Sequence, residues 1–166
     1  MKILVFSDTH GKSDKMYEII SRSRASCDLV VHLGDCWRDI DEIRNDFPQI
    51  AFLGVRGNCD FFASEQYPKS HCITLDGHTF YMVHGHMQAI KTHGFSLLTA
   101  EAKRLSADIA LYGHTHIGMH KEVNGVTVFN PGSLTNPRDY SGGSYGVITI
   151  DKGICKFEIC QINQGE

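Results

Sequence analysis

The sequence predicts one α/β domain that begins with parallel strands and ends with antiparallel hairpins. In the first half, short apolar runs rich in β-branched residues alternate with amphipathic stretches. In the second half, apolar runs are separated by turn residues such as Asp-Gly and Asn-Gly. The chain has 166 residues, of which 42% are hydrophobic and 21% are charged, so it is long enough to bury one core. We therefore expect a single domain over residues 1–166.

The first half contains three expected strands and two expected helices. The strands are apolar and nearly uninterrupted, as is typical of a parallel sheet covered on both faces, and lie at residues 3–6, 29–33 and 51–55. Residues 13–25 predict a helix with Ser13 as N-cap, because Met16 and Ile20 recur at helical spacing. Residues 40–47 predict a second, shorter helix.

The second half predicts hairpins around one more helix and one more buried strand. The expected helix covers residues 95–105 and the expected strand covers residues 109–112. Three hairpins are expected, turning at residues 76–77, 124–125 and 151–153, and Asp-Gly at the first suits a type I′ turn. The chain therefore changes from βαβ units to hairpins near residue 70.

Charge and apolar-run length limit the function classes. The net charge of −3 provides no general attraction to nucleic acid or to anionic lipid. No apolar run approaches the roughly 18 residues needed to span a membrane, and Met1 is followed by no signal-peptide pattern. We expect a cytoplasmic protein without a membrane partner, for which nucleic acid is at most a substrate. The six scattered cysteines are interpreted mostly as small buried hydrophobes.

Polar residues follow five of the expected strands, at the end where each strand leaves the sheet. In open α/β sheets this carboxyl end is where ligands bind. Taken singly, each cluster is also explained by a turn, an N-cap or a solvated loop. Their joint occurrence at successive strand ends is poorly explained that way. The clusters are Asp8-Thr9-His10, Gly34-Asp35, Gly57-Asn58-Cys59-Asp60, His84-Gly85-His86 and Gly113-His114-Thr115-His116.

The donor types in these clusters indicate metal binding. The sequence contains no nucleophile-elbow serine or cysteine and no phosphate-binding loop of the Gly-x-x-x-x-Gly-Lys type. Imidazole, carboxylate and amide oxygen suit ions such as Mn²⁺, Fe²⁺ or Zn²⁺. Seven or so ligands exceed the needs of one such ion, so we expect two divalent ions. A carboxylate is the natural bridge between them, since it offers two oxygens.

The ordered series of motifs resembles the calcineurin-like metallophosphoesterase superfamily. The Gly57-Asn58-Cys59-Asp60 variant and residues 130–133, Asn-Pro-Gly-Ser, are similar to its small YfcE-type phosphodiesterase branch. This resemblance covers residues 1 to about 150. It implies a four-layer α/β/β/α sandwich of mixed sheets and a hydrolase that cleaves a small phosphodiester.

Carried over by motif, the resemblance assigns ligands to both ions. It places Asp8, His10 and His116 on one ion, places Asn58, His84 and His114 on the other, and makes Asp35 the bridge. Mn²⁺ is favoured, with Ni²⁺, Fe²⁺, Zn²⁺ or Mg²⁺ as alternatives. Two such ions, two carboxylates and a bridging hydroxide leave one positive charge, which a phosphodiester monoanion neutralises. The implied reaction is in-line attack of that hydroxide on phosphorus.

Other residues near these motifs have less specific interpretations. His86 is a candidate catalytic residue that contacts the phosphate or the leaving group, with a supporting role as the alternative. Asp60 is expected to orient a neighbour such as His10, and residues 130–133 are expected to form a structural turn.

Trp37 is expected to pack rather than to stack on a base. Three arginines, at positions 38, 56 and 138, are either substrate contacts or solvated surface.

Two rival functions remain open. The scaffold subunit of the eukaryotic retromer complex has the same small fold, but the positions that match Asp35 and Asn58 are altered there. Phosphomonoesterases of the superfamily typically carry histidine after the Gly-Asn pair, where this chain has Cys59. Oligomeric state is not readable from the sequence.

Overall fold

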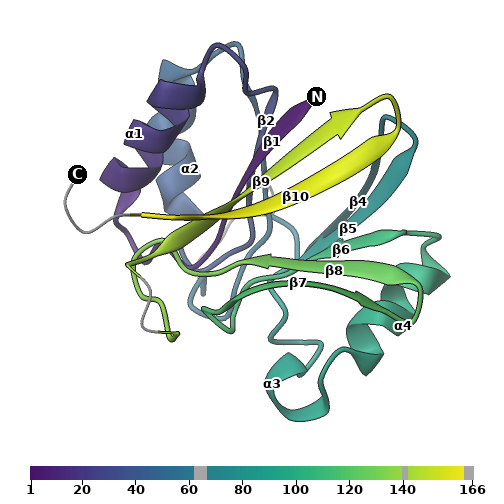
Figure 1. Ribbon diagram of the computed structural model, residues 1–166. Coiled ribbons are helices and arrows are strands. Elements are labelled where there is room, and N and C mark those ends of the chain that lie inside the picture. The colour runs from purple at the N-terminus through teal and green to yellow at the C-terminus, as the bar shows by residue number, and fades with distance from the viewer. Residues whose placement is uncertain (62–66, 140–141, 163–166) are drawn as a thin grey trace.

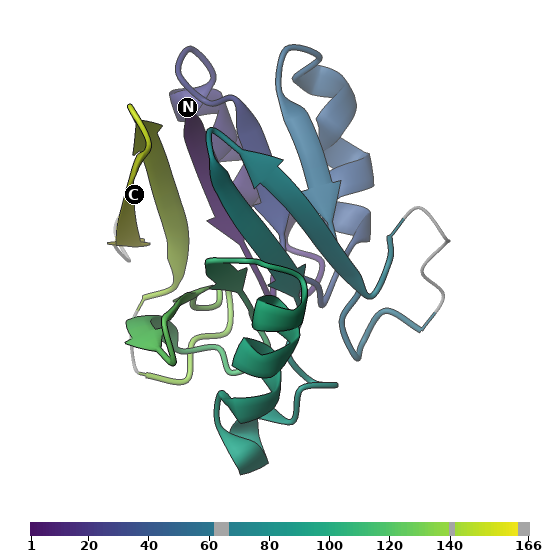
Figure 2. The same cartoon turned by 90° about the vertical axis from the view of Figure 1, so that its right-hand side faces the viewer.

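A computed structural model describes residues 1–61, 67–139 and 142–162, and it contains two five-stranded mixed sheets packed face to face. Figure 1 shows the two sheets with helices on their outer sides, and Figure 2 shows them after a quarter turn. The layers therefore run α/β/β/α, which confirms the fold class expected from the resemblance.

The first sheet has the strand order β10-β9-β1-β2-β3. Its parallel part consists of β1 (Lys2–Phe6), β2 (Leu29–His32) and β3 (Ala51–Gly54). The hairpin of β9 (Ser144–Asp151) and β10 (Ile154–Gln161) extends it, with β9 antiparallel to β1. Because β9 runs against β1, the turn of this hairpin lies at the end of the sheet opposite the carboxyl ends of the parallel strands.

The second sheet has the strand order β4-β5-β6-β8-β7. Its strands are β4 (Ser70–Leu75), β5 (His78–Val83), β6 (Ile109–Leu111), β7 (Gly118–Val123) and β8 (Val126–Pro131). β5, β6 and β8 are parallel, whereas β4 and β7 are antiparallel edge strands. The central residues of two expected hairpin turns, Asp76-Gly77 and Asn124-Gly125, have φ between 46° and 88°, as type I′ turns require.

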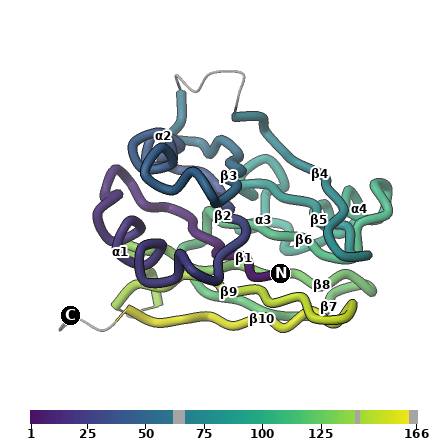
Figure 3. Tube along the Cα trace, turned by 90° about the horizontal axis from the view of Figure 1, so that it is seen from above, coloured from purple at the N-terminus to yellow at the C-terminus, as the bar shows by residue number. Residues whose placement is uncertain are grey.

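The helices cover the outer faces of the sheets. The first sheet is covered by α1 (Ser13–Ser23) and α2 (Arg38–Ile43), the latter followed by a 3₁₀ turn (Arg44–Asp46). The second sheet is covered by α4 (Ser96–Arg104), next to the short α3 (Ile90–His93), which the sequence analysis did not predict. Seen from above in Figure 3, α1 and α2 lie on the side of the first sheet.

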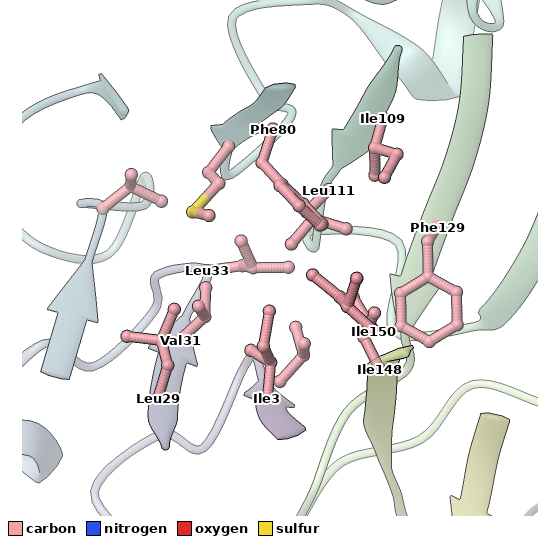
Figure 4. Packing of buried hydrophobic residues seen from close by; sticks show 13 residues of the cluster. Ile3, Leu29, Val31, Leu33, Phe80, Ile109, Leu111, Phe129, Ile148 and Ile150 are labelled. Atoms are coloured by element: carbon pink, nitrogen blue, oxygen red, sulfur yellow. The ribbon is translucent and has the colours of Figure 1, made fainter. Parts of the chain in front are cut away.

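The main core lies between the two sheets. Figure 4 shows Ile3, Val31, Phe80 and Leu111 pointing into this space. Alternate residues of the same strands, such as Leu4, pack beneath the helices instead. This two-sided burial explains why the parallel strands read as continuous apolar runs.

Two local predictions are wrong. The N-cap of α1 is Lys12, without a side-chain cap, and Ser13 Oγ donates a hydrogen bond to Glu42 Oε2 in α2 at 2.7 Å. All six cysteines are free, but only Cys27 is buried. Three of the others lie on the edge strands β4 and β10, where one face of the strand is not covered.

Candidate metal centre

The polar clusters after β1, β2, β3, β5 and β6 converge at the carboxyl ends of the parallel strands of both sheets. Backbone hydrogen bonds tie neighbouring loops together, from Asp8 N to Gly34 O at 3.0 Å and from Gly113 N to His84 O at 2.9 Å. The loops that carry Asp35 and Gly57 approach each other closely, since a Cβ built on Gly57 would lie 2.1 Å from Asp35 Oδ1. Only glycine fits at that position without displacing the carboxylate.

Several of the expected ligands have a strained backbone. Asp8, His10, Asp35, His114 and His116 all have φ between 49° and 65°, the left-handed region that L-residues seldom occupy. Such conformations each cost roughly 1–3 kcal/mol and cluster at functional sites. Five residues with such a backbone in one group of loops indicate that the loops are held in this conformation because it places their side chains at the site.

One group of potential ligands consists of Asp8, His10 and His116, whose ligand atoms lie within 4.8 Å of one another. Asp8 Oδ1 is 3.0 Å from His116 Nε2, and the rings of His10 and His116 have centroids 5.3 Å apart. His116 Nδ1 donates to Asn136 O at 2.6 Å, so in the neutral ring Nε2 presents its lone pair to Asp8. Two electron-rich atoms that face each other in this way are typical of a cation site.

A second group consists of Asp8, Asp35 and His84, again within 4.8 Å. His84 Nδ1 donates to Leu33 O at 2.7 Å, which leaves Nε2 for the site. Nε2 lies 3.2 Å from Asn58 Oδ1, 3.5 Å from Asp35 Oδ2 and 4.0 Å from Asp8 Oδ1. The side chains of Asp8, Asp35, Asn58 and His84 therefore surround one small volume.

His114 and His86 lie near these two groups of ligands but belong to neither. Their rings lie 5.1 Å and 5.4 Å from the His84 ring, centroid to centroid. Burial, with added repulsion from His84 and Lys91, lowers the pKa of His114 to about 4. Burial and His84 also lower the pKa of His86. Both rings are therefore neutral near pH 7 and able to act as ligands or hydrogen-bond partners.

The carboxylates stay ionised although burial opposes it. Burial raises the pKa of Asp8, but the contact with His116, the charge of His84 and the hydrogen bond from Ser7 lower it overall. Burial likewise opposes ionisation of Asp35, and contacts with His84 and Cys59 hold its pKa well below the usual value. Conversely, burial lowers the pKa of His84, but its contacts with Asp35 and Asp8 raise that pKa overall. The site therefore holds two negative charges.

One oxygen of the Asp8 carboxylate is placed to bind a metal ion. Its Oδ2 accepts hydrogen bonds from Ser7 Oγ at 2.6 Å and from His114 N at 3.0 Å. Its Oδ1 is buried and accepts no hydrogen bond from any residue that the structure describes. An ionised oxygen buried without a donor is costly unless a cation binds it.

Asp60 orients neighbouring residues, as expected, but the neighbours are in the loops of Asp35 and Gly57. Its carboxylate does not orient His10 but accepts backbone hydrogen bonds from Asp35 N at 2.9 Å, Gly57 N at 2.7 Å and Trp37 N at 3.3 Å. It therefore holds together the loops after β2 and β3. No periodicity in the sequence signals this role, because the donors are backbone groups up to 25 residues away.

His32 was also missed as a supporting residue. It is fully buried at the end of β2, where its Nδ1 accepts from Gly34 N at 3.2 Å and its Nε2 donates to Thr9 Oγ1 at 2.9 Å. Burial lowers its pKa, so the ring stays neutral. A lone histidine in an otherwise apolar strand was the available signal.

Residues 130–133, which were expected to form a turn, are the last two residues of β8 and the start of the loop after it, and they support the site. Asn130 Nδ2 donates to Gly113 O at 2.9 Å, and Ser133 Oγ donates to Asp8 O at 2.8 Å.

Cys59 Sγ lies within 4.8 Å of ligand atoms of His10 and Asp35, an approach that the sequence did not predict. Trp37 packs against Tyr67, with ring centroids 4.9 Å apart.

Comparisons with known proteins agree with this geometry. A family model described as the calcineurin-like phosphoesterase superfamily domain matches residues 1–153. A probable metallophosphoesterase of Bacillus subtilis, YsnB, is 31% identical over 91% of this chain and 85% of its own length. The phosphodiesterase YfcE of Escherichia coli is 27% identical over 91% of this chain and 89% of its own length.

Solved structures show the same fold. The crystal structure of a predicted phosphoesterase from Streptococcus pneumoniae matches with a TM-score of 0.79 and 30% identity, covering 99% of this chain and 93% of that one. Vps29 of Chaetomium thermophilum matches with a TM-score of 0.78 at 19% identity, covering 99% and 92%. No helix within the described ranges is long and apolar enough to cross a bilayer. The chain belongs to the calcineurin-like phosphoesterase superfamily.

Proposed function

We propose that this protein is a phosphodiesterase that depends on two divalent metal ions, with Mn²⁺ favoured. The observation that carries the proposal is the buried Asp8 Oδ1, which has no hydrogen-bond donor among the described residues and faces His116 Nε2 at 3.0 Å and His84 Nε2 at 4.0 Å. Two divalent ions with Asp8 and Asp35 carry a formal charge of +2, which attracts a phosphodiester monoanion. A cytoplasmic location stays a prediction of the sequence.

The proposed ligands are those of the two groups and their neighbours. Asp8, His10 and His116 would hold one ion, Asn58, His84 and His114 would hold the other, and Asp35 would lie between the two ions. Bound ions of this kind lower the pKa of water and polarise the phosphoryl group. The chain contributes orientation, because Leu33 O and Asn136 O select the tautomers of His84 and His116.

Two other residues support catalysis in this proposal. Cys59 N donates to Asp35 Oδ1 at 2.8 Å and so fixes the plane of that carboxylate. His86 Nδ1 is buried without a hydrogen-bond partner in the described part of the chain. A neutral His86 would donate a hydrogen bond to the phosphate of the substrate.

The test is to strip the protein of metal, reload it with Mn²⁺, Ni²⁺, Zn²⁺ or Mg²⁺, and assay a panel of phosphodiesters and phosphomonoesters. We expect hydrolysis of diesters, fastest with Mn²⁺, and at most slow hydrolysis of monoesters. Faster monoester cleavage would contradict the diesterase assignment.

The second candidate is a non-catalytic scaffold like Vps29. Metal binding does not separate it from an enzyme, because one solved structure is of Vps29 from Entamoeba histolytica complexed with Zn²⁺. The presence of both Asp35 and Asn58 favours the enzyme. Stoichiometric metal binding without turnover of any ester in the panel would favour the scaffold.

Substitution of Cys59 tests which group protonates the leaving group. Burial and Asp35 raise the pKa of the thiol to about 11, so it is a poor proton donor near neutral pH. We expect Cys59→Ala to keep turnover of an activated aryl diester within about tenfold of wild type, below the 10²–10⁴-fold typical of general acid catalysis. A loss beyond 10²-fold with both ions still bound, measured by steady-state kinetics and elemental analysis, would make the thiol catalytic.

Metal affinity should depend on pH through the imidazoles. Asp35 and Asp8 raise the pKa of His84, which must lose its proton before it binds metal, so protons compete with metal increasingly as the pH falls through that value. Because this pKa lies above the ordinary histidine value of about 6.5, we expect affinity to begin to fall above that pH and to fall steeply by about pH 6. Isothermal titration at pH 5–8 in buffers of different ionisation enthalpy measures both affinity and proton release. Affinity that is unchanged down to pH 5 would argue against imidazole ligands.

A further inference from the structure

A cavity of about 270 Å³ lies where the loops after β2 and β3 meet. Its lining residues follow the expected ligands directly in sequence and are Cys36, Trp37, Arg38, Cys59, Asp60 and Phe61. Cys59 connects the cavity to the metal centre, since its Sγ lies within 4.8 Å of a ring nitrogen of His10 and a carboxylate oxygen of Asp35. A phosphodiester at the metal centre would therefore extend one of its ester groups toward this cavity.

Two aromatic residues of the lining differ in how they are held. Trp37 is half-buried, packs against Tyr67 at 4.9 Å and an interplanar angle of 35°, and donates its backbone N–H to Asp60 Oδ1 at 3.3 Å. Phe61, in contrast, is 85% exposed. An exposed phenyl ring beside a fixed indole offers apolar surface that a planar ligand would remove from water.

Arg38 gives the cavity a positive charge. Its guanidinium carbon lies 5.7 Å from the centroid of the Trp37 ring, within the range of a cation–π contact. The other charged lining residue, Asp60, has its carboxylate engaged by three backbone N–H groups. The exposed phenyl ring of Phe61, the fixed indole and the guanidinium together suit a ligand in which a planar aromatic ring is attached to an anion.

We propose that this cavity is a specificity subsite for an aromatic ring carried by the phosphodiester substrate, either a nucleobase or an aryl group. This inference rests on the proposed phosphodiesterase function and specifies its substrate class. The volume is below the 300–1,000 Å³ of typical drug-sized pockets, so it accommodates one ring system rather than a whole dinucleotide. Stacking on Phe61 and Trp37 would supply the binding energy.

Binding can be followed without catalysis, because Trp37 is the only tryptophan in the chain. Its fluorescence is recorded in the metal-loaded protein during titration with adenosine 5′-monophosphate, phenyl phosphate or ribose 5-phosphate. We expect saturable quenching by the ligands that carry a ring and none by ribose 5-phosphate. Quenching by adenosine 5′-monophosphate alone would identify the bound ring as a nucleobase, and quenching by phenyl phosphate alone would identify it as an aryl group. Absence of quenching by both, or equal quenching by ribose 5-phosphate, would overturn the proposal.

Phe61→Ala is the matching variant, since a side chain so exposed is removed with little effect on folding. We expect it to weaken binding of the ring ligand about tenfold, at the lower end of measured base–aromatic stacking. The control is Ile154→Ala, which removes another largely exposed apolar side chain, 64% exposed, at the start of β10 beside the distant β9–β10 turn, and should change nothing.

Kinetics separate failure of this inference from failure of the proposed function. We expect Phe61→Ala to lower kcat/KM about tenfold for a nucleoside or aryl diester and to leave a dialkyl diester unchanged. Equal loss for both diesters would overturn the subsite while keeping the diesterase. If the wild-type protein cleaves no diester with any metal, the proposed function fails, and the fluorescence titration still decides whether the cavity binds a ring.

Discussion

Asp35→Asn is expected to abolish most diester hydrolysis and to lower the bound metal from two ions toward one. The Asp35 carboxylate is near both His10 and His84, so it reaches both sides of the site. A neutral amide bridges two cations poorly, and its NH₂ group adds a donor where a lone pair is needed. Because loss of mere supporting residues costs 10–100-fold, loss of the bridge should lower kcat by more than about 100-fold. Elemental analysis and steady-state kinetics measure the two effects.

Two variants sharpen this experiment. Asp8→Asn should weaken mainly the ion held by His10 and His116, so occupancy should fall less than in Asp35→Asn. Asp76→Asn makes the same chemical change in an exposed hairpin turn and should change neither quantity. Two tightly bound ions and intact turnover in Asp35→Asn would rule out Asp35 as the bridge.

Asp60→Ala is expected to lower the free energy of unfolding by about 3 kcal/mol. The substitution removes the acceptor of three backbone N–H groups, and a buried donor left without an acceptor costs roughly 1–3 kcal/mol, with water recovering part of the loss. The loop that carries Asp35 should loosen as well, so metal affinity should fall. Urea unfolding of the metal-free and the metal-loaded protein measures both effects.

Asp60→Asn is the conservative comparison, because it keeps one carbonyl oxygen and should fall between Ala and wild type. Asp46→Ala, at an exposed position of the 3₁₀ turn after α2, controls for loss of an acidic side chain. A change below about 1 kcal/mol in Asp60→Ala would mean that water replaces the carboxylate and that Asp60 does not hold the loops.

Much of the fold was predictable from local patterns. The parallel strands are buried on both faces, so they read as apolar runs, and the Asp-Gly and Asn-Gly pairs adopt the left-handed angles that their hairpins need. The short α3 was not predictable, because a single helical turn after Ala89 carries no periodic signal. Ser13 was assigned as a cap by residue type alone, while its hydroxyl bonds to Glu42, which is distant in sequence.

The candidate site divides in the same way. Its members were readable because parallel strands of one sheet end at one edge, so the residues that follow them in sequence must meet in space. Their arrangement was not readable, because it depends on contacts between residues far apart in the chain. Asp60 holds Asp35 through backbone donors, His32 supports Thr9 from the neighbouring strand, and Cys59 approaches His10. Local sequence specifies which side chains reach the edge of the sheets, whereas packing of one sheet on the other, with five ligand-bearing residues held at positive φ, decides which of their atoms face each other.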